Sequence, residues 1–318
     1  MQKRNSVLAF ALCAQAVLVS AHSVPEAPEP TPLDPLLLAF GFNDITPIRT
    51  QKLAEGMYVL FGLGGNILVS SGKDGVVIVD DQFPRVWDKL SAAMQAMGDE
   101  GVDFAINTHW HFDHAEGNKT LGQQGTWLVS QANSREMMQD DHLINLVSAS
   151  YVQQAYPEHA LPDITYDESM QFHLNGEQVD LMHFGPAHTT GDTAVIFRGR
   201  NAVHLGDVYN NAGYPFIDAG NGGSLEGVIH FCESVLEEID EDTIVVPGHG
   251  PVSTYAELAA YTEMLSTIRD EMVAMIKDGK SLEAIQAAGI TARWDKQYGD
   301  PTSLLNRSYV SLTTRYLD

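Results

Sequence analysis

The sequence predicts an α/β fold in which two β-sheets pack against each other and helices cover their outer faces. Short apolar, β-branched strands separated by glycines and tight turns occur in two successive groups, at residues 57–129 and 170–246. Segments with the 3.6-residue apolar spacing of helices lie within and after these groups. Because a sheet must bury its apolar face against another element, two strand groups with helices between them indicate two packed sheets.

The first strand group reads as a meander followed by a helix and further strands. We expect strands at 57–61, 66–70, 76–79, 104–106 and 127–129. Between them, apolar residues at helical spacing predict a helix over 86–97 that stops at Gly98. Residues 132–165 show no motif that defines an element, and we expect irregular or helical structure there.

The second group begins with a hairpin. Residues 170–174 and 179–184 flank Asn175-Gly176, a pair suited to a tight type I′ turn. Strands at 194–197, 202–205 and 244–246 follow. Thr254 and Glu257 form a capping-box pattern, which predicts a long helix that ends near Gly279, and a short helix is expected at 281–288.

The chain divides into four expected segments. Lys3 and Arg4 precede an apolar run at 7–19 and then small residues, which predicts a secretory signal peptide at residues 1–21. The alternative is an uncleaved N-terminal anchor. Residues 22–40 are rich in proline and acidic residues and are expected to form an extended tether. The main domain is expected at 41–252, with a C-terminal helical extension at 253–318 packed on it.

Composition limits the partners. The formal net charge of −24 disfavours phosphate backbones and anionic membranes, so we expect no nucleic-acid partner. After cleavage of the signal peptide no stretch is apolar enough to span a bilayer. We expect a periplasmic or secreted protein that acts on a small molecule.

The chemistry-bearing segment is Thr108-His109-Trp110-His111-Phe112-Asp113-His114, directly after an expected strand. Neutral imidazoles and a carboxylate are natural zinc ligands, and a loop would let all four side chains converge. Without a cation between them, so many titratable groups would repel one another or lack partners. The string therefore predicts a metal site.

This string resembles the signature of the metallo-β-lactamase superfamily, and further motifs follow in the expected order. They are Val79-Asp80-Asp81, Gly185-Pro186-Ala187-His188-Thr189, His204-Leu205-Gly206-Asp207 and Pro247-Gly248-His249-Gly250. The resemblance covers about residues 50–252 and implies a four-layer αβ/βα sandwich. It implies that His109, His111 and His188 hold one Zn²⁺, that Asp113, His114 and His249 hold a second, and that Asp207 bridges both. This ligand set is similar to that of the glyoxalase II and lactonase branches.

The resemblance implies a zinc-dependent hydrolase. Two ions can share a hydroxide that attacks a lactam, lactone, ester or thioester carbonyl, and β-lactamase activity is included. Asp113 is expected to orient the hydroxide and handle its proton. Asp80 is expected to fix a ligand histidine or its loop, or else to satisfy backbone amides at a strand end. Tyr214 is the expected substrate contact, with a packed turn as its alternative.

Two other functions remain open. One is a mononuclear iron dioxygenase of sulfur compounds, and the other is a metal-binding protein without turnover; iron or manganese also suit such ligands. Several histidines lie outside the motifs or on strands facing the core and are not expected to bind metal: His142, His159, His173, His183, His204 and His230.

Overall fold

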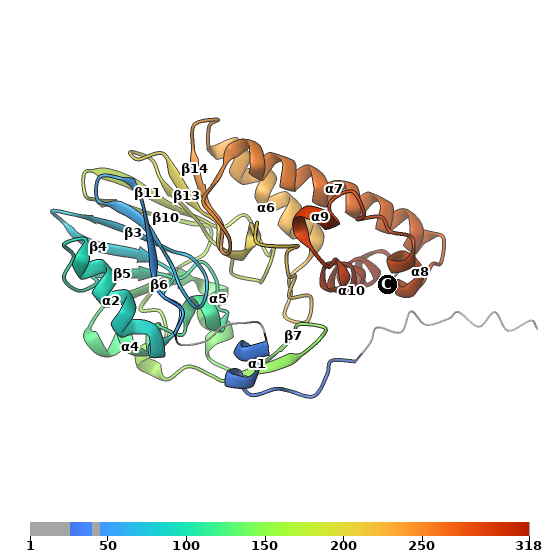
Figure 1. The fold of residues 1–318 in the computed structure, drawn as a ribbon, viewed down its shortest axis with the longest axis horizontal. Coiled ribbons are helices and arrows are strands. Elements are labelled where there is room, and N and C mark those ends of the chain that lie inside the picture. Colours follow the sequence, from blue (N-terminus) through green and yellow to red (C-terminus); the bar gives the residue numbers. More distant parts are fainter. Residues whose placement is uncertain (1–25, 40–44, 318) are drawn as a thin grey trace, which may run out of the picture.

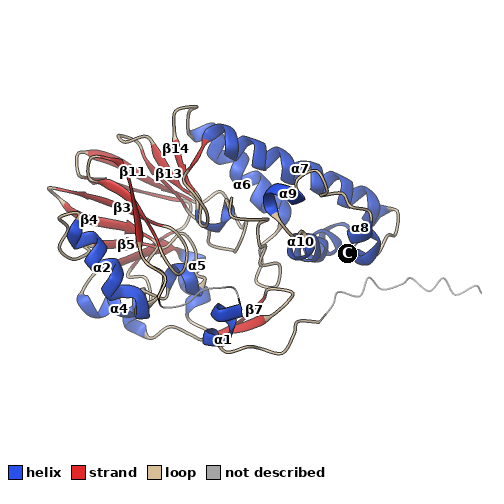
Figure 2. Ribbon diagram, in the orientation of Figure 1, coloured by secondary structure: helices blue, strands red, loops and turns tan. Residues whose placement is uncertain are grey.

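The computed structural model describes residues 26–39 and 45–317, and two facing sheets form its centre (Figure 1). The expected signal peptide at residues 1–21 lies outside the described residues. Figure 2 shows helices on the outer side of each sheet, with the C-terminal helices gathered beside the second sheet. The fold is the α/β sandwich that the sequence predicts.

The first sheet has the strand order β1-β2-β3-β4-β5-β6-β9. Strands β1 to β4 pair antiparallel, whereas β4, β5, β6 and β9 run parallel. The strand bounds are β1 Arg49–Ala54, β2 Met57–Phe61, β3 Ile67–Gly72, β4 Gly75–Val79, β5 Phe104–Ile106, β6 Trp127–Gln131 and β9 Ile164–Tyr166.

The second sheet has the order β10-β11-β12-β13-β14-β15. All neighbours pair antiparallel except β13 and β14, which are parallel. The bounds are β10 Ser169–Leu174, β11 Glu177–Met182, β12 Ala194–Phe197, β13 Ala202–His204, β14 Ile244–Val246 and β15 Ser253–Thr254. A separate hairpin, β7 (His142–Asn145) with β8 (Ser150–Gln153), lies outside both sheets.

Helices cover the two outer faces. Those of the first half are α1 Leu33–Ala39, α2 Trp87–Ala96, α3 Phe112–Ala115, α4 Asn118–Gln124 and α5 Ala132–Met138. Those of the second half are α6 Leu225–Glu238, α7 Tyr255–Lys277, α8 Leu282–Ala287, α9 Asp295–Tyr298 and α10 Thr302–Leu317. Within the described ranges, none of these helices is long and apolar enough to cross a membrane.

Three apolar clusters hold these layers together. Buried residues of both sheets, such as Val59 and Val195, form the cluster between the sheets. A second cluster, which includes Leu90, joins the first sheet to its helices. A third, which includes Val203 and Tyr261, joins the second sheet to α6, α7 and the helices that follow. The C-terminal helices therefore pack on the second sheet as part of the same body.

The local turn and cap signals agree with the structure. Asn175 and Gly176 have φ values of 54° and 80°, as a type I′ turn requires. Thr254 and Glu257 make both hydrogen bonds of the capping box, and α7 begins at the next residue. The turn and the cap depend only on backbone angles and hydrogen bonds between residues close in sequence. Both can therefore be predicted without knowledge of the tertiary structure.

Two segments differ from expectation. Residues 33–39 form a helix rather than an extended tether, because Leu36 and Leu37 are buried in the cluster beside the first sheet. Thr31 also bonds through its backbone to Ser150 of β8. Residues 132–165 contain α5, the β7–β8 hairpin and β9. Their strands are short and pair with distant partners, so no local period marks them.

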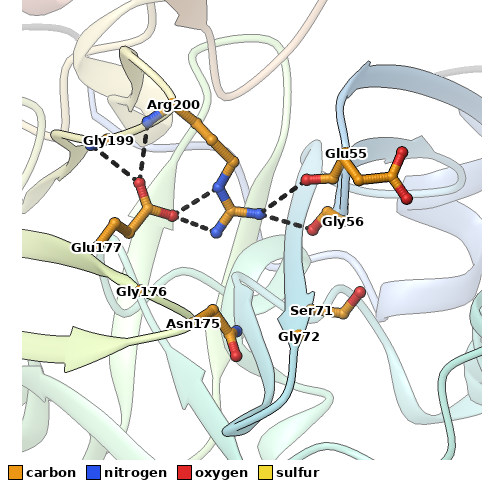
Figure 3. Close-up of a pocket in the computed structure, with 9 residues that line it drawn as sticks. All are labelled: Glu55, Gly56, Ser71, Gly72, Asn175, Gly176, Glu177, Gly199 and Arg200. Atoms are coloured by element: carbon orange, nitrogen blue, oxygen red, sulfur yellow. Dashed lines mark hydrogen bonds and ion pairs between the residues drawn. The ribbon is translucent and has the colours of Figure 1, made fainter.

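At one end of the sandwich, Arg200 links the two sheets across a cavity of about 520 Å³ (Figure 3). Its guanidinium bonds to the Glu177 carboxylate and donates to the Gly56 carbonyl (2.8 Å). The turns around this cavity precede β4 and β13, whereas Asp80 and Asp207 follow those strands. The cavity therefore lies at the end of the sheets opposite to the predicted metal ligands.

Candidate metal centre

Strand direction brings the predicted ligands to one end of the sandwich. The histidine string follows β5, His188 follows β11, Asp207 follows β13 and His249 follows β14. Strands β13 and β14 are parallel, and β11 has the same direction because both β11 and β13 are antiparallel to β12. The loops after these three strands therefore meet at one edge of the second sheet, and the histidine string after β5 of the first sheet converges on them there.

A change of backbone conformation inside the histidine string lets its side chains converge. His111 is extended (φ −63°, ψ 148°), and the next residues form the short helix α3. His109 and His111, two positions apart, direct their rings to the same side, and the helical turn at residues 112–115 brings Asp113 and His114 close to them. The Gly65 backbone touches the His114 ring so closely that a Cβ at this position would overlap it.

His109, His111 and His188 form the first set of converging ligand atoms, all within 4.8 Å of one another. Each imidazole is oriented through its other nitrogen. His111 Nε2 faces Asp218 Oδ2 at 3.0 Å, and His188 Nδ1 faces the Phe216 carbonyl at 2.8 Å. His109 Nδ1 lies 3.0 Å from Thr108 Oγ1. All three rings are buried.

Asp113, His114 and His249 form the second set, by the same 4.8 Å measure. His249 Nε2 lies 3.1 Å from Asp113 Oδ2 and 3.2 Å from His114 Nε2. The Asp113 side chain is 20% exposed, whereas His114 is fully buried. This set therefore has a face that solvent and a substrate can reach.

Asp207 lies between the two sets. Its Oδ1 is 3.2 Å from His114 Nε2 and 3.4 Å from His249 Nε2, and its Oδ2 is 3.8 Å from His188 Nε2. One carboxylate oxygen thus faces each set. Gly248 passes so close to Asp207 that a side chain there would displace the carboxylate.

The electrostatics of the two sets differ. Burial, and then the neighbouring imidazoles, holds the pKa of His109 well below its ordinary value. Burial also lowers the pKa of His188. Burial would lower the pKa values of His114 and His249, but the carboxylates of Asp207 and Asp113 outweigh it and raise both. His109 and His188 of the first set therefore favour the neutral imidazole, whereas His114 and His249 of the second set favour the protonated form.

These contacts fit a cation. If His111 donates to Asp218 and His188 donates to the Phe216 carbonyl, the lone pairs of His111 Nδ1 and His188 Nε2 face each other at 2.9 Å. His109 Nε2 is buried without a hydrogen-bond partner. Buried lone pairs that converge without donors are costly unless a positive ion lies between them. Nitrogen and carboxylate donors are those that zinc accepts.

Asp80 lies directly behind the second set. Its Oδ2 is 2.7 Å from His114 Nδ1 and accepts a bond from Thr108 Oγ1 (2.8 Å), while its Oδ1 accepts the Thr108 amide (2.7 Å). Asp80 is fully buried with a φ of 64°. It thus contacts the predicted ligand His114 and also satisfies a backbone amide, so both alternatives for this residue describe its contacts.

Sequence reasoning missed the residues that orient the first set. Asp218 contacts His111 from 107 positions further along the chain, and Phe216 contacts His188 through its carbonyl. Asp192 accepts the Thr189 amide (2.8 Å) and so fixes the loop that carries His188. Only Asp192 has a local signal, since it lies three residues from Thr189; nothing in the sequence pairs Asp218 with His111.

The structure places the remaining candidates away from the ligand sets. The Tyr214 hydroxyl donates to Asp295 (2.9 Å) and Thr291 (3.2 Å), and its ring lies 5.3 Å from that of Tyr298. His183 faces the Asp192 carbonyl and His204 the Asn66 carbonyl. The described contacts of Tyr214 are thus with the C-terminal segment, as in a packed turn.

Comparison with known proteins agrees with this geometry. The family model of the Metallo-beta-lactamase superfamily matches residues 61–249. An atrochrysone carboxyl ACP thioesterase of Aspergillus chevalieri is 25% identical over 247 residues, covering 76% of this chain and 69% of that protein.

Two solved structures share the fold. A metallo-beta-lactamase from Pontibacter korlensis superposes with a TM-score of 0.56 at 17% identity, over 69% of this chain and 99% of that one. A sec-alkylsulfatase from a Pseudomonas species superposes with a TM-score of 0.64 at 13% identity, over 85% of this chain and 50% of that one.

Proposed function

The chain belongs to the metallo-beta-lactamase superfamily, and from that premise we propose that it is a dinuclear zinc hydrolase of carbonyl compounds. The observation that carries the proposal is the position of Asp207. One of its oxygens faces His188 of the first set and the other faces His114 and His249 of the second. A carboxylate between two sets of imidazoles suits two cations better than one.

In this proposal His109, His111 and His188 hold one ion, Asp113, His114 and His249 hold the other, and Asp207 contacts both. When bound, such a pair of ions lowers the pKa of water and withdraws charge from the bond to be cleaved. Asp113 orients the attacking water and receives its proton at the carboxylate. Burial would raise the pKa of Asp113, but the imidazoles of His114 and His249 outweigh it and lower the pKa, so the carboxylate is ionised and accepts a hydrogen bond from the water.

The remaining residues act through the ligands. Asp80 and Asp218 accept the outer N–H groups of His114 and His111, which leaves the opposite nitrogen of each ring free to bind metal. The Phe216 carbonyl does the same for His188. Four of the seven residues, His109, His111, His114 and His188, are buried, and each is held through its outer ring nitrogen, so much of the site is preorganised for its ions.

For the substrate we propose a small molecule with a lactam, lactone, ester or thioester carbonyl. The similar protein from Aspergillus chevalieri is a thioesterase by name, which favours a thioester. The lactam remains in the proposal because a solved structure with the same fold is a metallo-beta-lactamase by name. We also propose a periplasmic or secreted location and no nucleic-acid partner, on the apolar run at 7–19 and the net charge of −24.

A hydrolysis panel tests the proposal. The purified zinc-loaded protein is assayed against a cephalosporin, an N-acyl homoserine lactone, an aryl ester and an acyl thioester, with metal counted on the same sample. Hydrolysis of at least one substrate with two zinc ions per chain supports the proposal. One iron per chain with oxygen uptake would instead support the dioxygenase. A protein that holds its full complement of metal but hydrolyses none of the substrates would support the alternative of a metal-binding protein without turnover.

A further inference from the structure

A second cavity, of about 300 Å³, shares a wall with the metal centre. That wall is Phe216, whose ring centroid lies 6.1 Å from that of His111 and 5.8 Å from that of His188. The other walls are the β7–β8 turn at Leu146, Val147 and Ser148, and residues at the start of α10. Phe216 thus stands between this cavity and the first set of imidazoles, so a chain that lies along the Phe216 ring would run from the cavity toward the metal centre.

The β7–β8 turn presents a strained side chain to this cavity. Val147 has a φ of +71°, a region that β-branched residues rarely adopt. The strain is maintained by the bond from the Ser148 amide to the Leu146 carbonyl (2.9 Å) and by Asn145 Oδ1, which accepts the Val147 amide (3.0 Å). Strained residues cluster at ligand clamps, where the surroundings determine their conformation.

Two polar residues of the cavity, Asp300 and Thr302, are bonded to each other. Asp300 Oδ1 accepts the amide and the hydroxyl of Thr302, at 2.9 and 2.6 Å, and these bonds lower the pKa of Asp300. The carboxylate is thus ionised and would repel an anionic ligand. Leu146, Val147 and Phe216 offer apolar surface. A neutral, apolar group suits these walls.

We propose that this cavity binds the straight acyl chain of the substrate and sets its length. The inference rests on the proposed function, because it assigns a binding site to the acyl chain that adjoins the carbonyl to be cleaved. A methylene group takes up about the same volume as a water molecule, which is about 30 Å³. The cavity of about 300 Å³ therefore has room for on the order of ten methylene groups. Residues 300–303 lie outside residues 61–249, the part of the chain that the family model matches, so membership of the family does not itself assign them a role.

The first arm of the test is hydrolysis of 4-nitrophenyl esters from acetate to dodecanoate by the zinc-loaded protein. Each methylene that enters an apolar cavity contributes about a fourfold gain in kcat/KM. We expect kcat/KM to rise with chain length until the cavity is filled and then to level off. The variant Ser303→Phe fills the cavity and should shift this limit to shorter chains, while Val147→Gly widens it and shifts it to longer ones.

Thr314→Phe is the matched control, because it adds the same bulk to an exposed position of α10 outside the cavity. It should keep the wild-type profile. A wild-type profile that does not depend on chain length, or one that Ser303→Phe leaves unchanged, would overturn the inference.

The second arm separates the two proposals by calorimetric binding of uncharged 2-alkanones, which contain a carbonyl that cannot be hydrolysed. Affinity that rises with chain length and is lost in Ser303→Phe supports the cavity, even if no ester is hydrolysed and the proposed function fails. Ester hydrolysis without chain-length dependence in either arm leaves the proposed function standing and refutes the acyl-chain site.

Discussion

Replacing Asp80 by Asn tests whether a hydrogen bond from outside the ligand set controls metal binding. The carboxylate accepts three bonds, from the Thr108 amide, the Thr108 hydroxyl and His114 Nδ1, at 2.7, 2.8 and 2.7 Å. Asparagine has the same shape and tolerates the φ of 64° at this position. It can still accept the Thr108 amide, but its NH₂ group then faces His114 Nδ1.

This change forces a different tautomer on His114. Two N–H donors cannot face each other, so the His114 proton moves to Nε2, the atom that lies 3.2 Å from Asp207 Oδ1. Because Nε2 then no longer offers a lone pair, the second ion should bind about 10- to 100-fold more weakly, as is typical when such a partner is lost. That factor corresponds to about 1.4–2.7 kcal/mol of binding free energy.

The assay is zinc competition against a chromogenic chelator at fixed pH. Asp180→Asn is the matched control, since Asp180 is also buried but contacts Arg198 and Gln178 in the second sheet. Thermal unfolding of the metal-free proteins checks that both variants fold. If Asp80→Asn binds two ions with wild-type affinity, Asp80 does not set the tautomer of His114.

Three further predictions follow from the same contacts. Asp218→Asn should lower the affinity for the first ion by about 10- to 100-fold and leave the affinity for the second unchanged, because Asp218 orients His111. A chelator competition in which the affinity for the second ion falls instead would refute this assignment. Metal binding to the second set should release protons at pH 7, because the carboxylates raise the pKa values of His114 and His249. The metal affinity of this set should therefore fall as the pH is lowered. Calorimetry in buffers of different ionisation enthalpy measures the proton release, and a value of zero would contradict the prediction. Arg200→Met should lower the free energy of unfolding by about 3 kcal/mol, the lower end for a broken buried ion pair, because the buried Glu177 carboxylate loses its cation but keeps the amides of residues 199 and 200 (Figure 3). Lys52→Met, at an exposed ion pair, should change that free energy by less than about 1 kcal/mol in urea unfolding, and equal losses would refute the role of Arg200 as a clamp.

The parts of the fold that were predictable from sequence are those with a local cause. The Asn175-Gly176 turn and the Thr254–Glu257 cap depend on backbone angles and bonds within a few residues. The strands that precede the ligands are short apolar runs, and their directions bring the loops together. The convergence of the seven candidate ligands was predictable because the histidine string is dense and each later motif follows such a strand.

The parts that were not predictable depend on contacts between distant segments. Helix α1 forms where Leu36 and Leu37 find a cluster to enter, and the prolines before them suggest only an extended chain. Asp218 acquires its role because the loop before α6 passes His111. The cavity beside Phe216 needs α10 and the β7–β8 turn, neither of which has a sequence signal that relates it to the metal centre.

The central claim is that Asp207 joins two metal positions, and a metal count on the wild type and on Asp207→Ala tests it most directly. Each protein is loaded with zinc, freed of excess by gel filtration and analysed by atomic emission, with hydrolysis measured on the same samples. The wild type should hold two ions per chain, and the variant should fall toward one and lose activity. A variant that keeps two ions and full activity, or a wild type that holds one, would contradict the claim.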